Sequence, residues 1–159
     1  MLERILLAVD MSDHARKAVP AAAELARAGG GTVQVLHVRE LYYPPVPPRV
    51  VGDSPEEAQQ LVDGVVAELQ QAGVIADGVV RTSTGGSPAS AILEQAREVG
   101  AGMVVLGSRG LSDLGGLLLG SVAHKVIQLS ACPVLVVRDE ESLQQRHDDV
   151  LRAQTRFQA

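Results

Sequence analysis

The feature that most constrains the fold is an alternation of short β-branched runs with longer segments whose apolar residues recur at helical spacing. Five runs are predicted to be strands, over residues 4–9, 32–38, 74–81, 102–107 and 134–137. Strands that alternate with helices are typical of βαβ units, in which the strands lie parallel in one sheet. Right-handed crossovers that wind both ways from the first strand predict an open five-stranded parallel sheet of order 3-2-1-4-5. We therefore expect a Rossmann-like α/β fold with helices on both faces of the sheet.

Four helices are predicted between these strands. The first carries an apolar stripe over residues 15–26. The second opens at Ser54-Pro55-Glu56-Glu57, which combines a capping box with proline at the first helical position. Ser87-Pro88 is predicted to open the third helix in the same way. Gly120-Ser121 opens the fourth, which is expected to end before Cys132-Pro133.

Two segments fall outside the alternation. Residues 39–53 contain four prolines, which forbid a helix and favour an extended loop. In the tail over residues 139–159, apolar residues from Leu143 to Phe157 recur every seven residues, a spacing compatible with a short amphipathic helix. We therefore expect one domain over residues 1–138 and a separate C-terminal tail.

The composition limits where the chain works and what it contacts. Of 159 residues, 46% are apolar and 21% charged, and the longest apolar runs are far shorter than the ~20 residues of a membrane span. No cleavage site follows the first apolar run, and the single cysteine, Cys132, cannot form an internal disulfide. We therefore expect a soluble cytoplasmic protein with no membrane partner. The net charge of −5 and the presence of only two tyrosines and one phenylalanine argue against nucleic acid as a partner.

The densest group of glycines lies between the fourth predicted strand and the fourth predicted helix. Gly107 and Gly110 would let backbone N–H groups approach an anion, and Gly120-Ser121 would supply free amides and a hydroxyl at a helix N-terminus. This loop leaves the carboxyl end of strand four, and Asp10 ends strand one. If these strands straddle the reversal in strand order, the loop and Asp10 face each other across the crevice in which open α/β sheets bind ligands.

Glycines in a connection have two interpretations, since they either bind an anion or only shape the turn. The common phosphate-binding motifs are absent. Asp10-Met11-Ser12-Asp13 stands where a G-x-G-x-x-G would follow the first strand, and no G-x-x-x-x-G-K-[ST] occurs. A dinucleotide-binding Rossmann enzyme and a P-loop ATPase are therefore disfavoured.

The spacing of the loop glycines is more specific than their number. Gly107-x2-Gly110-x9-Gly120-Ser121 matches in full the G-x2-G-x9-G-[ST] pattern of ATP-binding universal stress proteins, and the chain resembles that family. Further segments that are similar to the family follow in the family's order, over residues 5–10, 35–38, 86–88 and 131–137. The resemblance extends roughly from residue 3 to residue 138. It implies the same 3-2-1-4-5 sheet, of the adenine nucleotide alpha hydrolase-like type.

The resemblance also implies a ligand, which is ATP or its relatives ADP and AMP, accompanied by Mg²⁺ or Mn²⁺. It places Asp10 near the ribose and the backbone at Val38 against adenine. The nucleotide-binding residues that it implies are Ala8, Asp10, Val38, Gly107, Arg109, Gly110, Gly120, Ser121 and Val122. The chain departs from the family pattern at the start of its first helix, where Met11 replaces a usual glycine and His14-Ala15 replaces a common second serine.

For function, the resemblance implies a stress-response protein that works as a nucleotide-dependent regulatory or interaction module with unidentified protein partners. A slow ATPase or nucleotidyl transferase is the alternative, and a protein that acts through contacts without nucleotide is a third hypothesis. Phosphoryl transfer needs a metal-holding acid, a water-orienting group and cations, and the groups on offer are only Asp10, Asp113, Arg109 and Lys125. We therefore predict no catalytic residue. The resemblance and the apolar last strand predict a homodimer joined across Val134 to Val137.

The histidines and the cysteine are predicted to have structural roles. His14, His37, His124 and His147 share no metal-ligand spacing, so no metal site built by protein side chains alone is expected. His37 lies in a predicted strand and is expected to be a hydrogen-bonded core residue. Cys132 is expected to be a buried, unreactive thiol.

Overall fold

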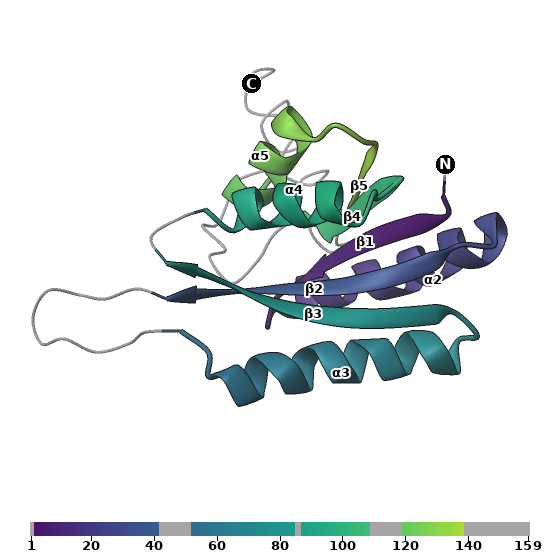
Figure 1. Cartoon of the computed structure of the whole chain (residues 1–159), viewed down its shortest axis with the longest axis horizontal. Helices are drawn as coiled ribbons and strands as arrows, with labels where there is room; N and C mark the ends of the chain where they lie inside the picture. The colour runs from purple at the N-terminus through teal and green to yellow at the C-terminus, as the bar shows by residue number, and fades with distance from the viewer. Residues whose placement is uncertain (1, 42–51, 85–86, 109–118, 139–159) are drawn as a thin grey trace, which may run out of the picture.

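The computed structural model describes residues 2–41, 52–84, 87–108 and 119–138. Its five strands form one parallel sheet of order β3-β2-β1-β4-β5, which confirms the predicted topology (Figure 1). The strands are β1 (Arg4–Val9), β2 (Thr32–Leu41), β3 (Ile75–Thr84), β4 (Met103–Gly107) and β5 (Val134–Val137). The order reverses between β1 and β4, so that the chain winds outward from β1 in both directions.

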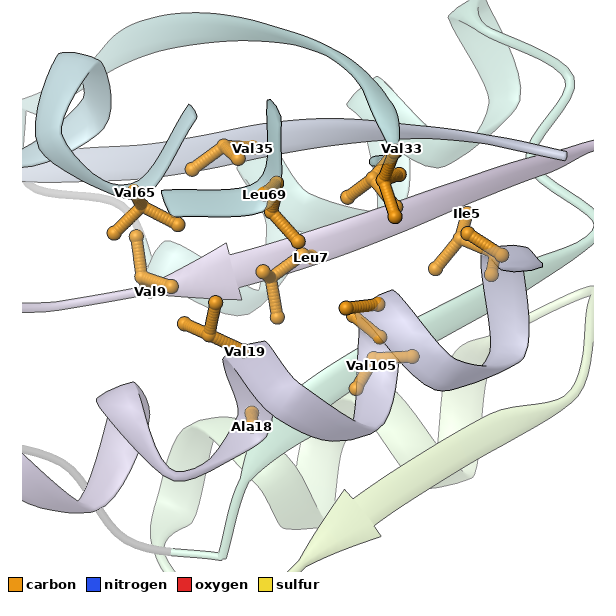
Figure 2. Packing of buried hydrophobic residues seen from close by; sticks show 14 of the residues in the cluster. Ile5, Leu7, Val9, Ala18, Val19, Val33, Val35, Val65, Leu69 and Val105 are labelled. Carbon is orange, nitrogen blue, oxygen red and sulfur yellow. The ribbon is translucent and has the colours of Figure 1, made fainter. Parts of the chain in front are cut away.

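Helices cover both faces of this sheet, as predicted. They are α1 (Asp13–Arg16), α2 (Ala18–Gly29), α3 (Pro55–Gln71), α4 (Pro88–Glu98) and α5 (Ser121–Leu129). Successive residues of a strand point to opposite faces, so Ile5 and Leu7 of β1 pack with α2 and α3 (Figure 2), whereas Leu6 and Ala8 pack with α4 and α5. The fold therefore has three layers and two apolar cores. No helix in the described ranges has the length and apolar character needed to cross a bilayer.

Two strands extend further than the apolar runs predict. The β2 strand was expected to end at Val38 but continues to Leu41, and β3 was expected to end at Arg81 but continues to Thr84. Their ladder runs without interruption to the pair Leu41↔Thr84. Backbone pairing continues here through polar residues, because the hydrogen bonds of a ladder do not require apolar side chains. At their other ends, β3 and β4 each begin one residue later than predicted.

The first helix is not continuous, contrary to the prediction. It divides into α1 and α2 at Lys17, and the Ser12 hydroxyl caps α1 by accepting a hydrogen bond from the amide of Ala15 at 3.2 Å. Pro20 explains the division. Proline has no N–H with which to bond the carbonyl of Arg16, four residues earlier, so the chain ends one helix at Arg16 and starts another.

The other helix starts follow the sequence with one exception. Ser54 and Glu57 form the predicted capping box of α3, with Pro55 in the first turn. Ser87 is the N-cap of α4, but its side chain makes no capping hydrogen bond, so the prediction that α4 opens in the same way as α3 is wrong in this respect. Gly120 is the N-cap of α5, as predicted.

Candidate functional site

A cavity of about 550 Å³ lies at the carboxyl ends of β1 and β4, where the strand order reverses. Its volume lies in the range of small-molecule sites, and its place is where open α/β sheets bind ligands. Seven of the nine predicted binding residues line it, and these are Ala8, Asp10, Val38, Gly107, Gly120, Ser121 and Val122. The other two, Arg109 and Gly110, lie outside the described residues.

The floor of the cavity is apolar. It is formed by Ala8 of β1, Leu36 and Val38 of β2 and Leu106 of β4, with Ile92 of α4 beside them. The Ala8 side chain is smaller than those of its neighbours Leu36 and Leu106, so the floor is slightly hollow at the centre of the sheet. Such a floor suits a flat, weakly polar group, because burying its faces there gives up few hydrogen bonds to water.

The N-terminus of α5 forms one wall of the cavity. Gly120 is extended, with φ −66° and ψ 155°, and its amide donates to the carbonyl oxygen of Ser108 at 2.8 Å. The prediction that Gly120 supplies a free amide is therefore wrong. The amides that lack an intrahelical acceptor are those of the first turn, which begins at Ser121 and includes Val122. The first turn of α5 holds no acidic residue, so the positive end of the helix dipole is left for an anion.

Asp10 lines the cavity directly after β1. Its Oδ1 accepts hydrogen bonds from the amide of Ser12, at 2.9 Å, and from the Ser12 hydroxyl. Ser12 also caps α1, so the same side chain fixes both the helix start and the Asp10 carboxylate. Met11 stands between them, is 39% exposed and lines the cavity.

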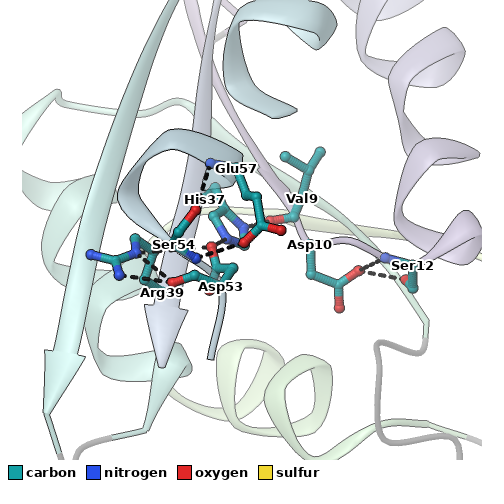
Figure 3. A network of polar contacts seen from close by, with 8 residues as sticks. All are labelled: Val9, Asp10, Ser12, His37, Arg39, Asp53, Ser54 and Glu57. Carbon is teal, nitrogen blue, oxygen red and sulfur yellow. Dashed lines mark hydrogen bonds and ion pairs between the residues drawn. The ribbon is translucent and has the colours of Figure 1, made fainter. Parts of the chain in front are cut away.

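A third group of lining residues was not predicted. His37 is buried and hydrogen-bonded, as expected, but it also lines the cavity and contacts Asp53 (Figure 3). Asp53 and Glu57 come from the start of α3, and Glu40 comes from the end of β2. The only signal in the sequence was indirect: Asp53 precedes the capping box at Ser54, which brings the segment after the proline-rich stretch back to the sheet.

Charge is distributed unevenly around the cavity. Its described lining contains four carboxylates, from Asp10, Glu40, Asp53 and Glu57, and no lysine or arginine. The hydrogen bonds that Ser54 makes to Glu57 lower the pKa of this carboxyl below its ordinary value of 4.5. The lining residues from β1, β2 and the start of α3 therefore accept hydrogen bonds, and the first turn of α5 donates them. This polarity fits an elongated ligand with hydroxyl or amino groups at one end and an anion at the other.

The remaining candidates lie away from the cavity or outside the described residues. In the described ranges, no group of three or more His, Cys, Asp or Glu side chains is arranged to hold a metal ion. Cys132 is a free thiol but only half-buried, so the prediction of a buried thiol is wrong; it lies just before β5, where its amide and carbonyl bond to the Ser130 hydroxyl. His124 and Lys125 are exposed on α5, and Asp113 and His147 are not among the described residues.

Comparison with known proteins gives a consistent result. The model of the universal stress protein family matches residues 1–138. The universal stress protein YxiE of Bacillus subtilis is 36% identical over 151 aligned positions, which cover 87% of this chain and all of that protein. The solved structure of MJ0577, from Methanocaldococcus jannaschii, superposes with a TM-score of 0.72 at 25% identity and covers 88% of this chain and 98% of its own. A universal stress protein from Archaeoglobus fulgidus in complex with dAMP superposes with a TM-score of 0.62 at 28% identity, over 86% and 98% of the two chains.

Proposed function

Because the chain belongs to the universal stress protein family, we propose that it is a stress-response protein that binds an adenine nucleotide in this cavity. The observation that carries the proposal is the polarity of the cavity, whose lining combines the first turn of α5 with the Asp10 carboxylate. A nucleotide has the matching polarity, since its phosphates are anionic and its ribose donates hydrogen bonds. The relative from Archaeoglobus fulgidus binds dAMP, which supports the same class of ligand.

We assign the parts of the nucleotide to parts of the cavity as follows. Adenine lies on the apolar floor, against the backbone at Val38 and the side chain of Ala8. The ribose hydroxyls donate to Asp10. The phosphates accept hydrogen bonds from the first-turn amides of α5 and from the Ser121 hydroxyl, and Gly107 lets the end of β4 approach them. Arg109 and Gly110 complete the phosphate side in this assignment. ATP, ADP and AMP share all of the groups that it uses.

A divalent cation, Mg²⁺ or Mn²⁺, would neutralise part of the phosphate charge. The described residues contain no three-ligand cluster, so we assign its ligands mainly to phosphate oxygens and water. Ser12 holds one carboxylate oxygen of Asp10, and we assign this carboxylate to ordering the ribose rather than to enclosing a metal.

We propose a regulatory or interaction module rather than an enzyme. The described lining offers carboxylates and one buried histidine, among which no general base or complete metal clamp can be assigned for phosphoryl transfer. Bound nucleotide would then act by changing the surface or stability of the protein, and so its protein partners. A slow ATPase or nucleotidyl transferase that uses the same cavity is the alternative.

The assembly and location belong to the same proposal. Strand β5 pairs with β4 along one edge, and its residues Val134 to Val137 are apolar and only half-buried, which supports a homodimer joined across this strand. We place the domain over residues 1–138 and treat residues 139–159 as a tail that is not needed for the nucleotide site. The single cysteine supports a reducing location, the cytoplasm.

The direct test is to identify what the protein carries and what it takes up. Mass spectrometry of material released from the denatured, freshly purified protein should detect an adenine nucleotide. Protein stripped of nucleotide should then be titrated calorimetrically with ATP, ADP and AMP, each with and without Mg²⁺, and with GTP as the control for the base. Binding of none of these nucleotides would refute the proposal.

A further inference from the structure

The His37 ring lies between two hydrogen-bond acceptors. Its Nδ1 is 2.9 Å from the carbonyl oxygen of Val9, and its Nε2 is 2.8 Å from Oδ2 of Asp53 (Figure 3). The ring is only 3% exposed, and the Asp53 side chain is 16% exposed. Water therefore cannot easily replace either contact.

These two contacts require one more proton than a neutral imidazole and a carboxylate contain. A carbonyl oxygen can only accept, so Nδ1 carries a proton, and the neutral ring then has a bare lone pair on Nε2. An ionised Asp53 also only accepts. The 2.8 Å contact consequently needs a proton between Nε2 and Oδ2, whichever atom it is bonded to.

Charged groups of both signs surround this pair. Glu57 of α3, Asp10 after β1 and Glu40 of β2 line the same cavity and are negative. Arg39 opposes them: its Nε lies 4.0 Å from Oδ2 of Asp53, and its Nη2 donates to the Asp53 carbonyl oxygen at 2.8 Å. On β3, Arg81 bonds to Gln95 of α4, on the other face of the sheet.

The shared proton joins two parts of the cavity wall. Val9 immediately precedes Asp10, and Asp53 immediately precedes Ser54, the N-cap of α3. The His37 bridge therefore ties the end of β1 to the start of α3 across β2. If the proton is lost, the Nε2 lone pair faces the Asp53 carboxylate, and the two repel each other.

We propose that His37 is a positioning residue, and that the proton which it shares with Asp53 holds the cavity wall in the geometry that binds nucleotide. The affinity for nucleotide then falls as rising pH removes this proton. The inference rests on the proposed function for its ligand, but the proton bridge itself does not depend on any ligand.

The bridge is tested first without nucleotide. Nitrogen-15 NMR of the imidazole rings, with His37 assigned from the H37Q spectrum, shows which ring nitrogens carry protons. We expect His37 to keep a proton on both nitrogens, or a proton shared with Asp53, to higher pH in the wild type than in D53N. In D53N the amide can donate to Nε2, so a neutral ring satisfies both contacts. A His37 that titrates identically in the two proteins would overturn the inference.

The coupling to binding is tested by titrating ATP calorimetrically from about pH 5 to 9. In the wild type, the Kd should rise about tenfold more across this range than in D53N, which corresponds to the loss of one charge-assisted hydrogen bond. Ionisation of the ATP phosphates contributes equally to both proteins. D63N is the matched control, because Asp63 is an exposed residue of α3 that bonds to Gln59 outside the cavity, and it should keep the wild-type profile.

The results separate the two hypotheses. If ATP binds but the profiles of wild type and D53N coincide, the role of His37 is refuted and the nucleotide site stands. If ATP binds at no pH, the proposed function fails, and the coupling fails with it. A D63N profile as flat as that of D53N would attribute the effect to net charge and would also overturn the inference.

Discussion

The backbone amide of Gly120 donates a hydrogen bond to the carbonyl oxygen of Ser108 at 2.8 Å. This bond brings the start of α5 to the end of β4, although eleven residues separate the two positions in the sequence. The amide of Ser108 in turn donates to the carbonyl of Val137 at 2.8 Å, so the connection is fixed to the sheet. Gly120, the last glycine of the G-x9-G spacing, is therefore held by a backbone hydrogen bond, and the helix N-terminus that follows it lines the cavity.

We expect Gly120→Val to abolish ATP binding while the sheet stays folded. The backbone at Gly120 is extended (φ −66°), which any residue can adopt, so the branched side chain is not excluded by strain. It would instead occupy the space at the N-terminus of α5 that the phosphates need. Thermal unfolding measures both effects. Nucleotide at 100 times its Kd should stabilise the wild type by about 2.7 kcal/mol and raise its Tm by roughly 5 to 10 °C.

The variant should show no such rise. Its Tm without ATP must be compared with that of the wild type, because valine is a poorer N-cap than glycine. A variant that is folded and gains the full rise would refute the assignment of the phosphates to α5.

We expect two glycine-to-alanine substitutions, in α3 and in the strand beneath it, to change stability in opposite directions. At Gly78 of β3 an added Cβ would collide with Cγ1 of Val62 and lie 3.0 Å from Cγ2 of Val66, so Gly78→Ala should cost roughly 1–3 kcal/mol. At Gly64, exposed in the middle of α3, a Cβ meets nothing within 4 Å. Gly64→Ala should therefore stabilise the protein by about 0.5–1 kcal/mol. Urea unfolding at 25 °C measures both values, and equal signs would show that the packing of α3 on β3 is described wrongly.

Local signals in the sequence predicted most of the fold. The strand Val134–Val137 was predicted with correct bounds because an apolar run lies between Pro133 and a charged residue. The capping box at Ser54 was predicted because it needs only residues three apart. The division at Lys17 could also have been predicted, since Pro20 lies inside the apolar stripe and has no N–H to continue a helix.

The candidate site was only partly predictable, because some of its contacts join distant segments. Asp53 contacts His37 although it lies sixteen positions later in the sequence, and nothing in this spacing indicates the contact. The bond from Gly120 to Ser108 likewise depends on how the chain returns to the sheet. The family pattern identified the glycines as important, but it did not show that the Gly120 amide is already bonded to the protein.

We expect Ser54→Ala to cost about 1 kcal/mol, and Glu57→Gln to destabilise the protein at neutral pH but less in acid. Ser54 accepts from the amide of Glu57, and its own amide donates to the Glu57 carboxylate at 2.8 Å, which lowers the pKa of Glu57 from 4.5. A carboxyl with a lowered pKa in the folded state stabilises the fold above its unfolded pKa, and this contribution is lost as the pH falls through the folded value. The difference in unfolding free energy between wild type and E57Q should therefore shrink below about pH 4.5. A difference that stays constant from neutral pH to pH 3.5 would show that the Glu57 carboxylate takes no part in the cap.

We expect the protein to be a dimer and Val136→Lys to weaken its association at least tenfold. Val136 lies in the middle of β5, is half-buried and packs against the core formed with α4 and α5. Among the described residues β5 is an edge strand, so lysine places a charge at this edge, and edge charges oppose strand pairing. Light scattering over a concentration series measures association, and circular dichroism shows whether the variant is folded. A wild type that remains monomeric at high concentration would refute the dimer.

We expect Asp10→Ala to weaken ATP binding. We also expect the wild type to have no significant turnover for this substitution to remove. The Asp10 carboxylate is held by Ser12 and faces the cavity, so its loss removes the expected acceptor for the ribose. No general base or complete metal clamp can be assigned among the described residues of the lining, so phosphate release by the wild type should be far below the ~10 per second typical of enzymes. A phosphate-release assay with ATP and Mg²⁺ measures turnover, and calorimetry measures binding.

Asp13→Ala is the matched control, because Asp13 is an exposed residue of α1 outside the cavity lining. Turnover near the enzymatic level that Asp10→Ala removes and Asp13→Ala retains would establish catalysis at this cavity in place of regulation by binding.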